Sequence, residues 1–327
     1  MKVAFFSTHA FERPYYVDCK LHELCFFDVA LTLETAKLAK GFPAICCFTT
    51  DSLNFSVLDQ LAHQGVRLIA LRSAGFNHVD LHAAMRLNIT VVRVPRYSPY
   101  AVAEHAAALI LALNRKINHA YLRIRENNFS IDGLKGFDLH GKTVGVIGTG
   151  NIGTAFAQIM RGFGCNLLAH DPIENETCLQ NGVRYVSLNE LYQTSDIISL
   201  HCPLNESNYY LINERAVSQM KQGMMLINTS RGGVIDTAAV ISGLKSGKIA
   251  YLGIDVYEAE EGLFFKDHSE DILMDDTFAR LQAFPHVLIT GHQAFLTHEA
   301  LLNIANITIN NMTAFETGTA LINVVIP

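Results

Sequence analysis

An arginine, a group of carboxylates and a histidine each follow an apolar segment in the second half of the chain. Arg231 lies in NTSRGG, Asp255 and Glu260 lie in GIDVYEAEE, and His292 lies in TGHQAF. If the apolar segments are parallel strands, these side chains share the carboxyl edge of one sheet, where open α/β sheets bind their ligands. We therefore expect them to meet in one site.

These side-chain types together suit one kind of chemistry. A guanidinium can hold a carboxylate in a planar fork, and a protonated imidazole can pass a proton to a carbonyl oxygen while a hydride arrives at the carbon. A carboxylate beside the imidazole orients it and favours its charged form. Reduction of a 2-oxoacid needs these groups. The spacing alone does not choose among Glu258, Glu260 and Glu261 as the partner of His292.

A glycine motif earlier in the chain predicts a dinucleotide site. The segment VGVIGTGNIG places Gly148, Gly150 and Gly153 directly after an apolar strand and at the start of a helical pattern. Glycine at these places allows a tight turn, a close approach of the backbone to a pyrophosphate and close packing of the helix on the strand. The helix N-terminus attracts the phosphate charge.

A carboxylate at the end of the next strand indicates which dinucleotide binds. Asp171 closes NLLAHD, 18 residues after Gly153 (171 − 153), where it can accept hydrogen bonds from ribose hydroxyls. It would repel the extra phosphate of NADP, and no arginine follows between positions 172 and 177. NAD is therefore the predicted cofactor.

The segment GFDLHGKT at 136–143 has the letters of an ATP phosphate loop. It leads into a strand, whereas a phosphate loop leads into a helix, so we reject ATP binding there.

Around these residues the pattern is that of an α/β protein. Half of the 327 residues are apolar, which suits two packed domains. Short apolar runs alternate with helical stretches, which predicts parallel sheets covered on both faces. The runs are KVAFFST, AICCFTT, VRLIAL and ITVVRV in the first hundred residues, and VGVIG, NLLAHD, DIISLHCP, MLINTS, IAYLGIDV and VLIT from Thr143 onward.

Two helices mark the predicted domain boundaries. Ser98 and Pro99 supply the cap and the first residue of one long helix through AVAEHAAALILALNRKINHAY. A last amphipathic helix, from Thr297 to about Gly318, is too short to form a domain and is expected to return to the first one. The predicted domains are residues 1–98 with 296–327, for the substrate, and residues 99–295, for the dinucleotide.

Composition argues against several classes of protein. The net charge is −6 without a basic cluster, so no nucleic-acid partner is expected. No apolar stretch approaches the roughly 18 residues of a membrane span. Seven cysteines, an odd number without C-x-x-C spacing, favour reduced thiols in the cytoplasm over a disulfide framework. His105, His140 and His201 lack metal-ligand spacing, so no metal site is expected.

Taken together, the motifs resemble a known family. SRGG, GIDVYEAE and TGHQAF, in that order after GTGNIG, resemble the D-isomer-specific 2-hydroxyacid dehydrogenases. ALRSAGFNHVDL, VPRYSPYAVAEH, ISLHCPL and GLFFKDHSEDILMDDTFARL extend the resemblance along the chain, toward the fermentative D-lactate dehydrogenase branch. The resemblance implies two doubly wound parallel-sheet domains, with a Rossmann NAD-binding domain inserted into a discontinuous flavodoxin-like substrate domain.

The resemblance also implies roles for particular residues. Arg231, Glu260 and His292 would form the catalytic set, and Asp255 would face the nicotinamide side of the cofactor. Backbone amides around Ala74, Gly75 and Phe76 would bind the substrate carboxylate, with Tyr97 and Phe295 shaping the pocket. The further residues expected at the cofactor are Asn151, Ile152, Cys202, Pro203 and Thr229.

The implied reaction is the reversible reduction of pyruvate to D-lactate with NADH. The alternatives are a relative acting on glycerate, hydroxypyruvate, phosphoglycerate or a branched 2-oxoacid, and a non-catalytic NAD-sensing scaffold. A phosphorylated substrate would call for cationic side chains that AGFN and TGHQAF do not supply. A cofactor domain of this kind is expected to pair about a two-fold axis, which predicts a homodimer or homotetramer.

Overall fold

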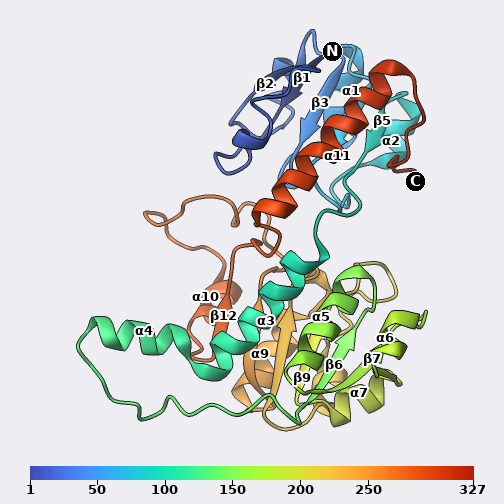
Figure 1. Cartoon of the computed structure of the whole chain (residues 1–327). Helices are drawn as coiled ribbons and strands as arrows, with labels where there is room; N and C mark the ends of the chain where they lie inside the picture. Colours follow the sequence, from blue (N-terminus) through green and yellow to red (C-terminus); the bar gives the residue numbers. More distant parts are fainter. The chain divides into compact units, whose positions relative to one another are not determined.

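The computed structural model describes residues 1–327 and divides them into two compact units. The discontinuous unit comprises Met1–Ser98 and Leu296–Pro327, and the continuous unit comprises Pro99–Phe295. In Figure 1, which is coloured by sequence, the discontinuous unit therefore combines blue and red segments. Neither unit contains a helix that is long and apolar enough to cross a membrane.

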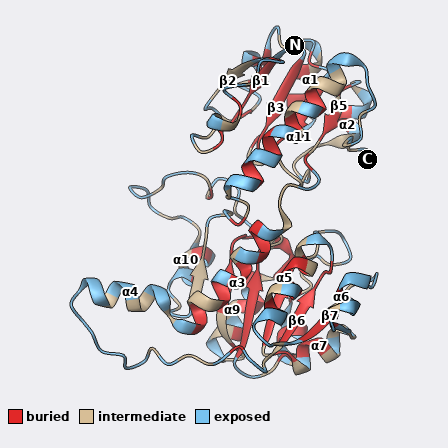
Figure 2. Cartoon of the chain, in the orientation of Figure 1, coloured by how far each residue is buried: buried red, intermediate tan, exposed pale blue.

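Five strands form the sheet of the discontinuous unit: β1 (Lys2–Phe5), β2 (Glu23–Phe26), β3 (Ala44–Cys47), β4 (Leu68–Leu71) and β5 (Thr90–Val92). They pair in parallel in the order β2-β1-β3-β4-β5, the flavodoxin-like order. Every residue of β3 and β4 is buried, as expected for a parallel sheet covered on both faces. Figure 2 shows these central strands in red.

The last helix of the chain completes the core of the discontinuous unit. The helices of this unit are η1 (Arg13–Tyr15), η2 (Ala36–Ala39), α1 (Phe55–His63), α2 (Leu81–Arg86) and α11 (His298–Thr317). Ala305 and Met312 of α11 join Val3 and Phe5 of β1 in one buried cluster. The Thr297 hydroxyl caps α11, and Gly318 ends it in left-handed backbone with φ 69°, so the predicted limits of this helix are confirmed.

Seven strands form the sheet of the continuous unit: β6 (Thr143–Ile147), β7 (Asn166–His170), β8 (Arg184–Tyr185), β9 (Ile197–Leu200), β10 (Met224–Asn228), β11 (Ile249–Ile254) and β12 (Val287–Ile289). They pair in parallel in the order β12-β11-β10-β9-β6-β7-β8. Within the unit this is the Rossmann order with one strand added at the end. The order reverses between β6 and β9, so the loops after these strands border the switch point.

The helices of the continuous unit are α3 (Pro99–Arg115), α4 (Ile117–Arg125), α5 (Asn151–Gly162), α6 (Glu176–Gln180), α7 (Leu188–Thr194), α8 (Glu214–Gln219), η3 (Gly232–Val234), α9 (Thr237–Lys245) and α10 (Asp276–Gln282). The expected single long helix after Ser98 is wrong, because it is broken into α3 and α4 at Lys116, which has φ 50°. The Lys116 ammonium donates to the carbonyls of Gly133 and Lys135 at 3.0 Å each, and these contacts fix the break.

Two strands were not among those expected from the sequence. β2 is an edge strand with no buried residue, and β8 has only two residues. The apolar run LCFF at 24–27, which overlaps β2, was not identified as a strand. The predicted fold class, two doubly wound parallel sheets, is confirmed, with five and seven strands.

Candidate active site

The glycine motif forms a tight loop between β6 and α5. Gly148 has φ 93°, and a Cβ on it would lie 2.7 Å from the amide nitrogen of Cys202. A Cβ on Gly153 would lie 1.9 Å from the carbonyl oxygen of Gly148, so only glycine allows this approach. A Cβ on Gly150 would meet no atom within 4 Å. The first and third glycines therefore serve packing, and the second leaves open space beside the backbone.

The start of α5 fits the pyrophosphate of a dinucleotide. The helix begins at Asn151, directly after Gly150, and no side chain caps its first N–H groups. Uncapped N–H groups at a helix N-terminus carry partial positive charge and suit a phosphate. Asn151 and Ile152 both lie in this first turn. Together with the open space at Gly150, this turn fits the predicted cofactor.

Asp171 holds the glycine loop, and its expected contact with the ribose stays a prediction. Its Oδ2 accepts from the Thr149 amide at 2.7 Å, and its Oδ1 accepts from the Ile173 amide at 3.0 Å. Thr149 is held further by the Tyr185 hydroxyl, which donates to its Oγ1 at 2.8 Å, and by Asn175 Nδ2, which donates to its carbonyl at 3.0 Å. Tyr185 and Asn175 were not predicted from the sequence, since neither belongs to the glycine motif.

Three further residues expected at the cofactor follow strands near the switch point. Cys202 and Pro203 come two and three residues after the end of β9, and Thr229 directly follows β10. Burial raises the pKa of the Cys202 thiol to about 11, so it is an uncharged side chain at neutral pH. The Thr229 side chain is buried. Contact of these residues with NAD stays a prediction.

Glu260 and His292 are in direct contact. His292 Nδ1 lies 2.8 Å from Glu260 Oε1, and both side chains are partly exposed. The other carboxylate oxygen of Glu260 accepts from the Tyr257 amide at 3.1 Å, which orients the carboxylate. His292 has left-handed backbone with φ 53°, a conformation that is unfavourable outside glycine and that recurs at functional sites.

The structure also distinguishes the neighbouring acidic residues. Glu258 accepts from the Tyr210 hydroxyl at 2.6 Å and from the Thr237 amide at 3.2 Å, so its carboxylate is used elsewhere. Among the three glutamates that the spacing left open, Glu260 is the one bonded to His292. The catalytic role of this pair stays a prediction.

Asp255 supports the loop that carries His292. Its carboxylate is almost fully buried and accepts from the Thr290 hydroxyl at 2.5 Å and from the Gln293 and Ala294 amides at 2.9 and 2.8 Å. Its carbonyl accepts from the His292 amide at 2.8 Å. These bonds define Asp255 as a positioning residue for His292. Its expected place beside the nicotinamide stays a prediction.

Arg231 lies directly before η3, in a loop packed against the one that carries Glu260. A Cβ on Gly232 would lie 2.1 Å from the carbonyl carbon of Tyr257, so glycine is required where the two loops touch. Asn228 Nδ2 donates to the Arg231 carbonyl at 2.9 Å, and Arg231 Nη1 donates to the Ser230 carbonyl at 2.7 Å. Arg231, Glu260 and His292 thus follow the adjacent strands β10, β11 and β12.

The residues expected at the substrate are divided between the units. Ala74, Gly75 and Phe76 follow β4 in the discontinuous unit, where Tyr97 also lies, and Phe295 is the last residue of the continuous unit. Arg93 Nη1 donates to the Ala74 carbonyl at 2.9 Å, and the Ser73 hydroxyl donates to the Gly75 carbonyl at 2.7 Å. The roles of all five residues stay predictions.

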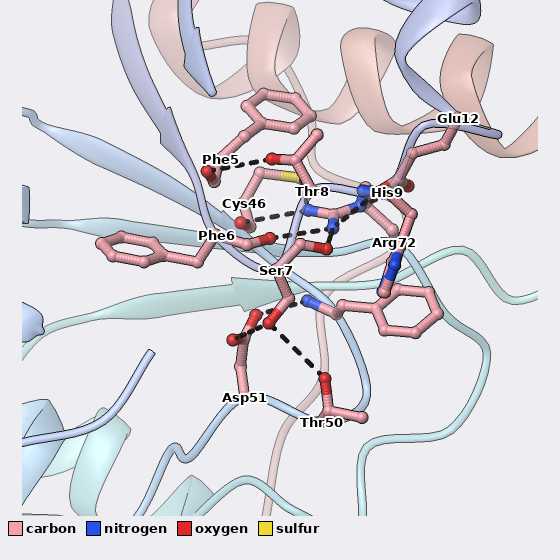
Figure 3. A network of polar contacts seen from close by, with 11 residues as sticks. Phe5, Phe6, Ser7, Thr8, His9, Glu12, Cys46, Thr50, Asp51 and Arg72 are labelled. Atoms are coloured by element: carbon pink, nitrogen blue, oxygen red, sulfur yellow. Dashed lines mark hydrogen bonds and ion pairs between the residues drawn. The ribbon is translucent and has the colours of Figure 1, made fainter. Parts of the chain in front are cut away.

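A buried ionic network joins the strand ends of the discontinuous unit. Figure 3 shows the Arg72 guanidinium among the ends of β1, β3 and β4. Its Nε and Nη2 donate to the two carboxylate oxygens of Glu12 at 2.8 and 3.0 Å, and Nη2 also donates to the carbonyls of Phe6 and Ser7. Nη1 donates to the Cys46 carbonyl at 3.2 Å. This network could not be predicted from the sequence, because Glu12 and Arg72 are 60 residues apart.

A second buried carboxylate belongs to the same sheet edge. Asp51 accepts from the Ser7 hydroxyl at 2.6 Å and from the amides of Leu31 and Phe48 at 2.7 Å each. Burial raises the pKa of Asp51 from its usual value, and these hydrogen bonds oppose that shift.

No group of three or more His, Cys, Asp or Glu side chains in the chain could hold a metal ion.

The chain is similar in sequence to known proteins. Residues 107–294 match the family model described as D-isomer specific 2-hydroxyacid dehydrogenase, NAD binding domain. The chain is 52% identical over 321 residues to the D-lactate dehydrogenase of Escherichia coli (strain K12), covering 97% of this chain and 98% of that protein.

Solved structures extend the likeness to the whole fold. The chain resembles the pyruvate reductase of Chlamydomonas reinhardtii with a TM-score of 0.95 and 45% identity, over 99% of this chain and 98% of that one. It also resembles the D-lactate dehydrogenase of Aquifex aeolicus, solved in complex with NAD and lactic acid, with a TM-score of 0.88 and 35% identity over 99% of both chains.

The match to the family model covers more than half of the chain, and the sequence identity extends over almost all of it. The matched residues contain the glycine loop, Asp171, Arg231, Glu260 and His292. By these findings, the chain belongs to the D-isomer specific 2-hydroxyacid dehydrogenase family.

Proposed function

We propose that this enzyme is a D-lactate dehydrogenase that reduces pyruvate to D-lactate with NADH. The observation that carries the proposal is the 2.8 Å contact between His292 and Glu260, which supplies an imidazole held by a carboxylate. The names of its relatives support the choice of substrate, because they include D-lactate dehydrogenases and a pyruvate reductase.

His292 acts as the proton donor in this proposal. Because Glu260 binds Nδ1, the atom left to give a proton to the substrate carbonyl oxygen is Nε2. The Glu260 carboxylate fixes the ring and stabilises the imidazolium that must exist before reduction. Proton transfer from Nε2 leaves a neutral imidazole, which takes a proton from solvent before the next turnover.

Arg231 binds the substrate carboxylate through its guanidinium fork, aided by the backbone amides around Ala74, Gly75 and Phe76. The bound NADH supplies the hydride. Asp255 keeps the His292 loop in place through its four hydrogen bonds to residues 290–294. The products are D-lactate and NAD.

The test follows the absorbance of NADH with pyruvate, hydroxypyruvate and 2-oxoisocaproate as substrates. We expect pyruvate to have the highest kcat/KM, NADPH to be a poor substitute, and D-lactate rather than L-lactate to support the reverse reaction. A preference for a branched or hydroxylated 2-oxoacid would replace lactate in the proposal but keep the family chemistry. Binding of NADH without reduction of any of them would favour the non-catalytic scaffold.

We further propose a homodimer or homotetramer in the cytoplasm. No residue of α4 is buried, and Ile117, Tyr121, Leu122 and Ile124 are each more than half exposed, which supports an interface on this helix. Light scattering should give twice or four times the mass of the chain, and Leu122→Glu should reduce it. A monomeric mass for both the wild type and Leu122→Glu would rule out the proposed oligomer.

The odd number of cysteines supports the proposed location in a reducing compartment, which cell fractionation tests.

A further inference from the structure

Two consecutive carbonyl groups in the loop after β4 are turned toward the protein. The Ala74 carbonyl accepts from Arg93 Nη1 at 2.9 Å, and the Gly75 carbonyl accepts from the Ser73 hydroxyl at 2.7 Å. All of these residues belong to the discontinuous unit and are partly exposed. The loop therefore has its backbone orientation fixed by two side chains.

The orientation of the carbonyls determines that of the next amides. In a planar trans peptide the C=O and the following N–H point in opposite directions. With the carbonyls of Ala74 and Gly75 held inward, the N–H groups of Gly75 and Phe76 point away from Ser73 and Arg93. Neither N–H donates a hydrogen bond within the chain. Two adjacent amides without a partner in the chain are available to bind an anion.

Arg93 is itself held in place from both ends. Its amide donates to the Asn323 carbonyl at 3.0 Å, and its carbonyl accepts from Asn311 Nδ2 at 3.0 Å. Its guanidinium lies 4.9 Å from the centre of the Phe76 ring, so it contacts the loop at both Ala74 and Phe76. The contact with the ring and the bond to the carbonyl together restrict the loop to one conformation.

Arg72, the other arginine beside the loop, serves a different purpose. It is buried, and its donors are used by Glu12, by the carbonyls of Phe6 and Ser7, and by Cys46. It anchors the end of β4, one residue before Ser73 (Figure 3), and has no donor left for a ligand. Arg93 is therefore the arginine whose guanidinium orients the loop.

We propose that Arg93 and Ser73 are positioning residues that aim the amides of Gly75 and Phe76 at the carboxylate of the 2-oxoacid. The proposal rests on the proposed function, because it assumes that these amides bind the substrate carboxylate. Arg93 and Ser73 act through the backbone and need no contact with the substrate.

The first test measures the binding of oxamate, an unreactive analogue of pyruvate that keeps its carboxylate, to the enzyme–NADH complex. The readout is the change in NADH fluorescence. Arg93→Met should weaken oxamate binding about ten- to a hundredfold, the effect of one hydrogen bond from a charged donor, and leave the Kd of NADH unchanged. Ser73→Ala removes a neutral hydrogen bond and should weaken oxamate about two- to tenfold.

Arg67→Met is the matched control. The Arg67 guanidinium lies in the same unit and also donates to backbone carbonyls, those of Ala62 at 3.1 Å and Val66 at 2.8 Å, but it does not contact the loop at 73–76. This variant should keep the wild-type affinity for oxamate.

A second readout separates amide orientation from general damage to the unit. It is the ratio of kcat/KM for pyruvate to kcat/KM for methyl pyruvate, whose ester has no anionic carboxylate. The ratio should fall in Arg93→Met and in Ser73→Ala, because the amides act on the anion. General damage lowers both rates alike and leaves the ratio unchanged.

The outcomes are distinguishable. A wild-type enzyme that neither reduces pyruvate nor binds oxamate refutes the proposed function itself. A wild-type enzyme that does both, with variants that keep its oxamate affinity and substrate ratio, refutes only the roles of Ser73 and Arg93. Loss in Arg93→Met without loss in Ser73→Ala would also overturn the proposal, because charge would then explain the effect. If Arg93→Met does not fold, Ser73→Ala decides alone.

Discussion

The carboxylate of Glu260 lies against one edge of the His292 ring, and its charge should be visible in the pH dependence of the reaction. Glu260→Gln keeps the shape of the side chain but removes the charge that stabilises the imidazolium. Because reduction needs the protonated ring, the alkaline fall in kcat/KM for pyruvate should move to lower pH.

The measurement is a pH profile at saturating NADH, after confirming that the chemical step limits the rate. Glu258→Gln is the matched control, since it removes a carboxylate two residues away that is bonded to Tyr210 and Thr237 instead. If the alkaline fall in kcat/KM moves in Glu258→Gln and does not move in Glu260→Gln, then Glu258 rather than Glu260 is the carboxylate that acts on His292.

Asp171 supports the glycine loop and is predicted to select the cofactor as well, so the choice of substitution matters. Asp171→Ala removes the charge and the acceptors for the Thr149 and Ile173 amides, whereas Asp171→Asn keeps one acceptor oxygen. Both variants should narrow the preference for NADH over NADPH. Asp171→Ala should lose more NADH affinity, by about five- to tenfold relative to Asp171→Asn. Fluorescence titration with both cofactors measures this, and equal NADH affinities would remove the loop-supporting role.

At the level of whole elements, α5 contains its own matched pair of glycines. A Cβ on Gly153 would lie 1.9 Å from the Gly148 carbonyl oxygen, whereas a Cβ on Gly162 would meet nothing within 4 Å. Gly153→Ala should push α5 away from the loop, destabilise the protein by about 1–3 kcal/mol and weaken NADH binding at least about tenfold. Gly162→Ala should leave NADH binding unchanged and stabilise the protein by up to about 1 kcal/mol.

Urea unfolding and NADH titration of the two variants provide the comparison. Wild-type NADH affinity in Gly153→Ala would mean that the helix does not need its close approach to the loop in order to bind the cofactor.

Local signals explain which elements could be predicted from sequence. The buried parallel strands appear in the sequence as apolar runs. The ends of α11 appear as Thr297 and Gly318, which cap the helix. The edge strand β2 was missed although LCFF at 24–27 is an apolar run, and the two-residue β8 is too short to leave one. The break at Lys116 was missed because lysine is a good helix former, and only its contacts with the distant Gly133 and Lys135 fix the turn.

The same distinction applies to the site. Arg231, Glu260 and His292 were identifiable because each follows a strand within a motif, and the choice among the three glutamates became possible only with the bond to Nδ1. Arg93 and Tyr185 were missed, because their bonds to Ala74 and Thr149 join residues 19 and 36 positions apart. No pattern along the chain indicates such pairs.

For the molecule as a whole, two half-buried histidines, one in each unit, should make its stability depend on pH. Burial lowers the pKa of His201 in the continuous unit to about 3, and that of His78 in the discontinuous unit to about 4. Both are therefore neutral when folded, whereas an unfolded histidine binds a proton below about pH 6.5. As the pH falls from about 6.5 toward 4, these two histidines bind protons in the unfolded chain but not in the folded one. The free energy of unfolding therefore decreases over this range, and these groups do not change it above about pH 6.5.

Each histidine should reduce the free energy of unfolding by up to about 1.4 kcal/mol per pH unit in this range. Urea unfolding at pH 7.5 and pH 5 should therefore show a smaller acid loss in His201→Asn than in the wild type. Identical losses in the two proteins would mean that His201 is protonated in the folded state.

The contribution of α11 to the first core has a consequence for synthesis on the ribosome. Residues 1–98 leave the ribosome first but lack Ala305 and Met312, which complete the cluster around Val3 and Phe5. The continuous unit has all of its core by Phe295 and can fold as soon as that residue emerges. We expect nascent chains arrested at the point where Phe295 has just emerged from the ribosome to resist protease within 99–295 and to be cleaved within 1–98. The part of the protein that is made first should therefore be the last to become stable.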